Sequence, residues 1–237
     1  MMNRFIKNNN HNKPYHIISM NAPDSAIAEQ YRKLHTNIDY SSFNKELKII
    51  NLTSSFPGEG KTVTVLNLAV VYSQANQKTL IIDMDLRKPK IHRAFNLSNT
   101  QGLTSVAIHG KDKSSVIQQI SENLHVLPAG DKMPFPVEFL TSKQLQNVIT
   151  ELKGEYDKII IDCPPMTAVT DASVISKLTD GTILIVTSRK TNEDVAKTVL
   201  KTLKDNGANV IGSVLTKVHR KDQKYISGYY YNNYTDE

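Results

Sequence analysis

Residues 47–62 read Leu-Lys-Ile-Ile-Asn-Leu-Thr-Ser-Ser-Phe-Pro-Gly-Glu-Gly-Lys-Thr. The first seven are short, mostly apolar and rich in branched side chains, which predicts a buried strand over 47–53. A glycine-rich turn follows, and the apolar residues after Thr62 predict a buried helix over 62–75. Strand, glycine-rich turn and helix in this order are the setting that a phosphate-binding loop requires.

The turn contains the residue types that hold a nucleotide. Gly58 and Gly60 let backbone N–H groups approach phosphate oxygens, and the helix N-terminus adds a partial positive charge. We expect Lys61 to bridge the β- and γ-phosphates of ATP and the Thr62 hydroxyl to bind Mg²⁺. The general pattern has Gly at the position of Ser55, so the alternative is a turn without a ligand. The expected ATP-binding residues are Pro57, Gly58, Glu59, Gly60, Lys61, Thr62 and Val63.

Two further apolar runs end in carboxylates. Residues 79–87 place Asp83 and Asp85 at the end of one predicted strand, where alternate side chains point to one face. Residues 158–165 place Asp162 at the end of another. In open parallel sheets, ligands lie beyond the carboxyl ends of the strands. These three aspartates and the phosphate loop are therefore expected to converge on one crevice.

Carboxylates at this crevice suit both a metal and a proton transfer. Mg²⁺ prefers hard oxygen ligands and keeps several waters, so Thr62, Asp85 and Asp162 are the expected metal ligands. A further aspartate can take the proton from an attacking hydroxyl. The alternative for each aspartate is a turn or a helix cap. The residues expected to carry the chemistry are Lys61, Asp83, Asp85 and Asp162.

The C-terminal end is rich in tyrosine within a polar stretch. A phosphate donor site and many phenol hydroxyls in one chain suggest a kinase that modifies tyrosine, including its own. The alternative is an adhesive docking peptide, because tyrosine is common at interfaces. The expected phosphoacceptors are Tyr225, Tyr229, Tyr230, Tyr231 and Tyr234.

Taken together, these motifs resemble the bacterial tyrosine kinases, which are P-loop proteins unrelated to eukaryotic protein kinases. Residues 58–62, 80–87 and 159–165 match the family's Walker A, Walker A′ and Walker B motifs in order. The Asp-Met-Asp-Leu-Arg-Lys-Pro string at 83–89 is the most specific part. The resemblance implies autophosphorylation in trans on the tail tyrosines.

Roles follow from the resemblance for the residues that match its motifs. It implies that Lys61 and Thr62 bind the phosphates and Mg²⁺, and that Asp83 is the base. It also implies that Asp85 and Asp162 support the metal and its waters.

The resemblance also implies partners. In Firmicutes-type members the kinase is a separate chain, activated by the cytoplasmic tail of a membrane protein, and the system controls capsular or exopolysaccharide synthesis and export. The family carries an oligomerisation motif, Glu-x-x-Arg-x-x-Arg, which implies a ring-shaped homo-oligomer. Glu29 and Arg32 match this motif, but His35 stands at its last position and cannot form the arginine fork. The alternative for these residues is a solvated charged helix face.

Composition limits the remaining possibilities. The 237 residues, 39% of them hydrophobic, fit one domain with a substantial core. A single cysteine, Cys163, excludes an intrachain disulfide and fits a reducing cytoplasm. No apolar run reaches the roughly 18 residues of a membrane span. The net charge of +6 comes without helix-turn-helix or zinc spacing, which argues against nucleic acid. We expect a cytoplasmic protein that its activator recruits to the inner face of the membrane, with other protein tyrosine substrates.

The alternation of apolar patterns predicts an α/β fold, a mainly parallel sheet with helices on both faces. The expected domains are a mobile N-terminal segment over 1–22, a P-loop kinase domain over 23–217 and a flexible tyrosine-rich tail over 218–237. The expected strands are 47–53, 78–83, 124–127, 157–162, 181–187 and 209–215. The expected helices are 24–40, 62–75, 103–108, 113–120, 136–152, 170–178 and 192–205.

A partition or site-selection ATPase of the same P-loop class is the rival interpretation. Those proteins act as binding switches and carry an extra lysine early in the loop. Phe56 occupies the matching position here, and such proteins typically lack a tyrosine-rich tail.

Overall fold

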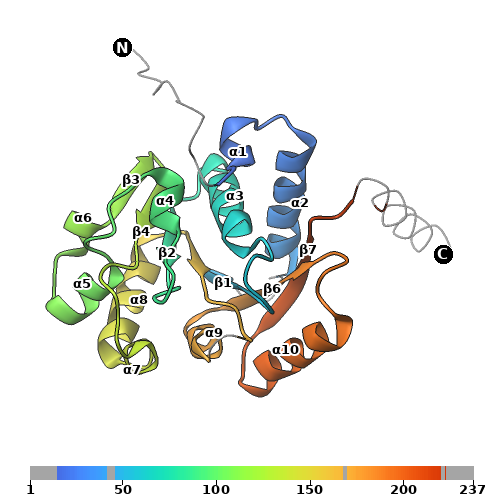
Figure 1. Ribbon diagram of the computed structural model, residues 1–237. Helices are drawn as coiled ribbons and strands as arrows, with labels where there is room; N and C mark the ends of the chain where they lie inside the picture. The colour runs from blue at the N-terminus through green and yellow to red at the C-terminus, as the bar shows by residue number, and fades with distance from the viewer. Residues whose placement is uncertain (1–14, 42–45, 168–169, 220–221, 223–237) are drawn as a thin grey trace, which may run out of the picture.

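The computed structural model describes residues 15–41, 46–167, 170–219 and 222. Within them, seven strands form one sheet in the order β3-β4-β2-β5-β1-β6-β7 (Figure 1). Every neighbouring pair is parallel except β3–β4, so the predicted mainly parallel α/β fold is confirmed. The strands are β1 (Ile49–Ser54), β2 (Thr79–Asp83), β3 (Gln118–Ser121), β4 (Leu124–Leu127), β5 (Lys158–Asp162), β6 (Gly181–Thr187) and β7 (Val210–Thr216).

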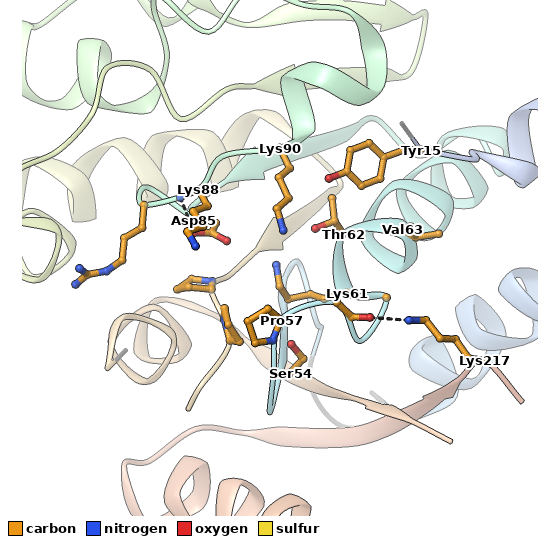
Figure 2. Close-up of a pocket in the computed structure, with 15 residues that line it drawn as sticks. Tyr15, Ser54, Pro57, Lys61, Thr62, Val63, Asp85, Lys88, Lys90 and Lys217 are labelled. Atoms are coloured by element: carbon orange, nitrogen blue, oxygen red, sulfur yellow. Dashed lines mark hydrogen bonds between the residues drawn. The ribbon is translucent and has the colours of Figure 1, made fainter. Parts of the chain in front are cut away.

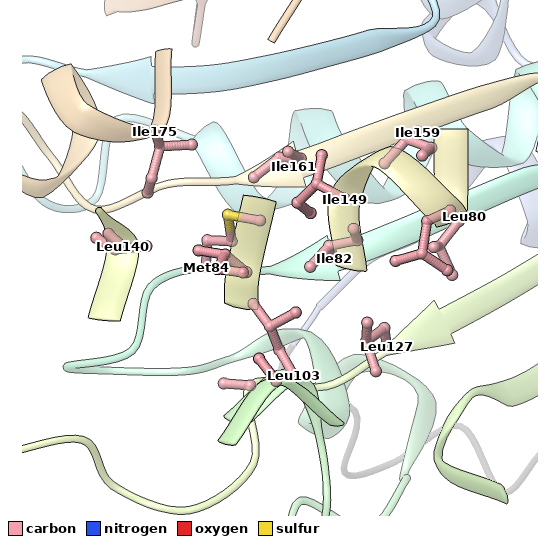
Figure 3. Packing of buried hydrophobic residues seen from close by; sticks show 14 of the residues in the cluster. Leu80, Ile82, Met84, Leu103, Leu127, Leu140, Ile149, Ile159, Ile161 and Ile175 are labelled. Atoms are coloured by element: carbon pink, nitrogen blue, oxygen red, sulfur yellow. The ribbon is translucent and has the colours of Figure 1, made fainter. Parts of the chain in front are cut away.

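Helices cover both faces of this sheet, because the central strands are apolar on both sides. Every residue of β1, β2 and β5 is buried, which is typical of strands covered on two faces. Leu80 and Ile82 pack on one face under α5 (Leu103–His109), α8 (Lys143–Glu155) and α9 (Asp171–Ile175) (Figure 3). Ile81, between them in sequence, packs on the opposite face under α2 (Ala26–Ser41) and α3 (Lys61–Gln74).

Most helices follow the expected alternation. The bounds are α1 (Ile18–Asn21), α2 (Ala26–Ser41), α3 (Lys61–Gln74), α4 (Ile91–Phe95), α5 (Leu103–His109), α6 (Lys113–Val116), α7 (Pro136–Leu140), α8 (Lys143–Glu155), α9 (Asp171–Ile175), a 3₁₀ turn (Ser176–Leu178) and α10 (Glu193–Asp205).

The helix predicted over 113–120 is wrong in its second half. α6 ends at Val116, and Gln118–Ser121 instead pairs antiparallel with β4 as the edge strand β3. The helix predicted over 136–152 is two helices, because Ser142 caps a new one. Its Oγ accepts a hydrogen bond from the Leu145 N–H at 3.2 Å, and α8 starts one residue after Ser142. The short helices α1 and α4 were not predicted.

The segment over 1–22, expected to be mobile, includes residues that pack against α3. Ile17 is 4% exposed and belongs to the core under α3. The Ser19 N–H donates to Asn67 Oδ1 at 2.9 Å. Residues 1–14 and all five expected tail phosphoacceptors lie outside the described residues. Within the described part of the chain, no helix has the length and apolar character needed to cross a membrane.

Candidate active site

The phosphate loop joins the end of β1 to the start of α3. Gly58 and Gly60 have φ of 80° and 95°, in the left-handed region that glycine adopts without strain. A Cβ added at Gly60 would also meet the Thr216 side chain at 3.4 Å. The glycine turn therefore packs against Thr216 at the end of β7. The N-terminus of α3, which follows the turn, can then present its partial positive charge to a bound anion.

A cavity of about 360 Å³ opens above this loop (Figure 2). Among the expected ATP-binding residues, Pro57, Gly58, Gly60 and Lys61–Val63 line it, whereas Glu59 does not. The cationic side chains that line it outnumber the single acidic one, Asp85, which suits a polyanion such as the phosphates of ATP. The cations are Lys61, Arg87, Lys88, Lys90 and Lys217.

Lys61, Thr62 and Asp162 form one buried constellation at the base of the cavity. Lys61 Nζ donates to Asp162 Oδ1, and Thr62 Oγ1 donates to Asp162 Oδ2 at 2.8 Å. Burial alone would lower the pKa of Lys61, but the charge and hydrogen bond of Asp162 outweigh it and raise this pKa. Lys61 is therefore held as a cation, and its bond to Asp162 joins the start of α3 to the end of β5.

Asp83 lies beneath the cavity and does not line it. Its Oδ1 accepts the Asp85 N–H at 3.2 Å, and its Oδ2 accepts the N–H groups of Lys90 and Ile91 at 2.8 and 2.9 Å. Burial, and then the charge of Asp162, raise the pKa of Asp83 to about 7. In this conformation Asp83 fixes the loop between β2 and α4.

Asp85 is the aspartate of this group that faces the cavity. Its Oδ1 accepts the Lys88 N–H at 3.1 Å. Burial raises the pKa of Asp85, and the charge of Lys61 opposes this shift. Among the described residues, no three His, Cys, Asp or Glu side chains converge on a point suited to a metal. Asp85, Asp162 and Thr62 fit Mg²⁺ only if phosphate oxygens and waters complete its coordination, as this ion commonly accepts.

Several side chains brace the phosphate loop by hydrogen bonds that local sequence pattern does not predict. Glu59 Oε2 accepts the Phe56 N–H at 2.9 Å, and Glu59 Oε1 accepts a hydrogen bond from Thr191 Oγ1. Thr216 Oγ1 donates to the Glu59 carbonyl at 2.6 Å, and Lys217 Nζ donates to the Gly58 carbonyl at 2.7 Å. The Glu59 side chain thus stabilises the loop through these hydrogen bonds and does not line the cavity.

Tyr15, Lys88 and Lys90 are cavity residues that the sequence analysis did not assign. The two lysines closely follow the carboxyl end of β2, and their place in the sequence could have identified them as residues of the site. Tyr15 precedes α1 in a segment without apolar periodicity, so no local signal identified it.

The expected oligomerisation residues lie on α2. Arg32 Nε donates to Glu29 Oε2 at 2.7 Å, with the side chains 41% and 47% exposed. His35, in contrast, turns toward α3, and its ring meets the Tyr72 ring edge-on with centroids 4.4 Å apart.

Comparison with known proteins identifies the fold and its relatives. A family model described as an AAA domain matches residues 47–214. The chain is 38% identical over 226 residues to the tyrosine-protein kinase YwqD of Bacillus subtilis, covering 94% of each chain. It superposes with a TM-score of 0.83 and 36% identity on the chimerical protein CapA2B2, covering 86% of this chain and 90% of that one. For the kinase domain of the Escherichia coli tyrosine kinase ETK, the TM-score is 0.81 at 27% identity, covering 91% and 87%.

The rival class of ATPase is also similar, but to a lesser extent. The septum site-determining protein MinD of Pyrococcus horikoshii, complexed with Mg-ADP, has a TM-score of 0.60 at 27% identity, covering 71% of this chain and 69% of that one. Both groups share the P-loop sheet, and the higher similarity over nearly the whole chain lies with the kinases. The chain belongs to the family of bacterial tyrosine-protein kinases.

Proposed function

We propose that this protein is an ATP-dependent tyrosine kinase that phosphorylates, in trans, the tyrosines of residues 225–234 of another copy. The observation that carries the proposal is the buried constellation of Lys61, Thr62 and Asp162 at the base of a cationic cavity. Such a cavity suits the charge of ATP, and the family membership supplies tyrosine as the acceptor.

The binding roles follow from where each side chain lies. Lys61 would exchange its bond with Asp162 for the β- and γ-phosphates. Thr62, Asp85 and Asp162 would hold Mg²⁺, which when bound offsets the charge that develops on the transferred phosphoryl group. Lys88 and Lys90 would hold the outer phosphate oxygens from the opposite wall.

The transfer needs a base for the acceptor phenol, whose free pKa is about 10. The phenol oxygen bonds to the γ-phosphorus, the bond to the bridging oxygen breaks, and ADP leaves. We propose Asp83 as the acceptor of the phenolic proton. Its pKa of about 7 suits a base near neutral pH. Since its oxygens now accept backbone N–H groups, the loop between β2 and α4 would have to open toward the acceptor.

The partners and setting are proposed on the family resemblance. The chain would assemble into a homo-oligomer through Glu29 and Arg32, and a membrane protein's cytoplasmic tail would activate it. It would then act in the cytoplasm at the inner face of the membrane, on its own tail and on other protein tyrosines. Its output would be the control of capsular or exopolysaccharide synthesis and export.

Mass spectrometry tests the proposal. The intact protein and its peptides are measured after incubation with ATP and Mg²⁺, with and without membrane extract, with Lys61→Met as the control. We expect several phosphates on residues 225–234 and none in the variant. ATP hydrolysis without any phosphotyrosine, even with extract, would instead favour the switch ATPase.

A further inference from the structure

A tyrosine from the N-terminal segment lies in the wall of the phosphate cavity. Tyr15 lines the cavity together with Lys61, Thr62, Asp85 and Lys90. Figure 2 shows its hydroxyl turned toward the space between Lys90 and Thr62. This phenol therefore faces the side of the cavity where the proposed function places the terminal phosphate of ATP.

The chain holds Tyr15 there through the residues that follow it. Asn67, on α3, donates from Nδ2 to the His16 carbonyl at 3.3 Å and accepts the Ser19 N–H at 2.9 Å. Gln74 Nε2 donates to the Ser19 carbonyl at 3.0 Å, and Ile17 is buried in the core under α3. α3 begins at Lys61, so one helix carries both this lysine and the side chains, Asn67 and Gln74, that hold the backbone next to Tyr15.

Tyr15 differs from the other tyrosines that the structure describes, because its hydroxyl faces the cavity. The Tyr72 hydroxyl bonds Asp39 at 3.1 Å, and the Tyr156 hydroxyl bonds His125 at 2.8 Å. Tyr31, on α2, does not line the cavity. Tyr40 is 74% exposed near the end of α2 and does not line the cavity either. Among these five phenols, only that of Tyr15 faces the phosphate loop.

We propose that Tyr15 is an intramolecular phosphoacceptor of this kinase. This inference rests on the proposed function, because it uses the same ATP, Mg²⁺ and active site. The Tyr15 oxygen bonds to the γ-phosphorus of ATP, the bond to the bridging oxygen breaks, and ADP leaves. The phenolic proton passes to a solvent water.

The cationic residues around Tyr15 would also stabilise the phosphorylated form of this tyrosine. Phosphorylation adds about −1.5 to −2 charges and three strong acceptor oxygens to the ring. Lys88 and Lys90, which line the same cavity, supply cations for those oxygens. A phosphate on Tyr15 would therefore remain in a favourable setting.

A mixing experiment separates transfer within a chain from transfer between chains. Heavy-isotope-labelled Lys61→Met chain is mixed with an equal amount of unlabelled wild type, ATP, Mg²⁺ and membrane extract, and the peptides are analysed by mass spectrometry. We expect phosphate on Tyr15 only in the unlabelled peptide, and phosphate on the tail tyrosines in both. Tyr15→Phe should remove this signal, whereas Tyr40→Phe should leave it unchanged.

Each other outcome has a distinct meaning. Equal phosphate on Tyr15 in both peptides would show transfer between chains and overturn the proposal. A phosphorylated tail with Tyr15 unmodified would also overturn it, while the proposed kinase function stands. Absence of phosphotyrosine from every peptide would overturn both.

Discussion

Lys61 and Asp162 form an ion pair that the protein encloses, with side chains only 8% and 1% exposed. The pair joins the start of α3 to the end of β5, two elements 101 residues apart in sequence. Under the proposed function, ATP would replace Asp162 as the partner of Lys61, and Mg²⁺ would replace Lys61 as the partner of Asp162. The ion pair would then stabilise the site in the absence of its ligand, through the groups proposed to bind it.

Breaking this pair from one side should destabilise the unliganded protein. Asp162→Asn leaves the Lys61 cation enclosed without its partner, and such a loss typically costs about 3–5 kcal/mol. The double variant Lys61→Met/Asp162→Asn removes both charges and should unfold at a higher urea concentration than Asp162→Asn alone. Lys197→Met, which breaks an exposed pair with Glu193, should change nothing measurable. If the losses in free energy of unfolding for Lys61→Met and Asp162→Asn summed to the loss in the double variant, Lys61 and Asp162 would not be energetically coupled.

Asp83 should make the stability of the unliganded protein depend on pH. The pKa of this carboxyl is about 7 in the fold, against about 3.9 when unfolded. Between these values the folded chain binds more protons, so its free energy of unfolding falls as pH rises, by up to about 1.4 kcal/mol per pH unit. Above pH about 7 this contribution is constant. Both states are then ionised.

Urea unfolding at about pH 5 and about pH 8 tests this dependence. The comparison is between wild type and Asp83→Asn, because the other titrating groups are common to both. We expect the wild type to lose more stability than the variant over this interval. Parallel curves for the two proteins would contradict the assignment to Asp83.

The sequence predicted those features of the fold and site that local pattern determines. All six expected strands are present, because their apolar runs can be buried only inside a covered sheet. The ends of parallel strands share one edge of the sheet, so the pattern also predicted that residues 57–63 and the aspartates at the strand ends lie near one another. Of these residues, Glu59, Asp83 and Asp162 do not line the cavity.

The errors come from contacts between distant residues. Gln118–Ser121 has no strong preference of its own, and becomes a strand because β4 offers a partner. The place of Asp83 depends on how the chain after β2 folds back to present the N–H groups of Lys90 and Ile91. Tyr15 reaches the cavity only because Asn67, 52 positions later, holds the backbone that follows it.

Glu59 should control how well the loop binds ATP, although it does not line the cavity. Glu59→Ala leaves the Phe56 N–H and the Thr191 hydroxyl without their acceptor, at a cost of about 1–3 kcal/mol for each such group that stays buried. We expect the KM for ATP to rise by about tenfold, equivalent to about 1.4 kcal/mol. Glu59→Gln, which keeps an acceptor oxygen, should lie closer to wild type. An unchanged KM in Glu59→Ala would contradict a bracing role.

Substitutions of His35 test the proposed assembly surface, because the family resemblance implies an oligomerisation motif with arginine at this position. Its ring packs edge-on against Tyr72, and its Nε2 lies 3.3 Å from Asp39 Oδ2. His35→Arg and His35→Ala should both lose the ring contact, at about 0.5–1.5 kcal/mol. Only the arginine variant restores the third member of the motif, so light scattering should find a greater oligomer mass for it alone. Adding Glu29→Ala to His35→Arg should reverse that increase. An equal mass for the arginine and alanine variants would argue against assembly through this face of α2.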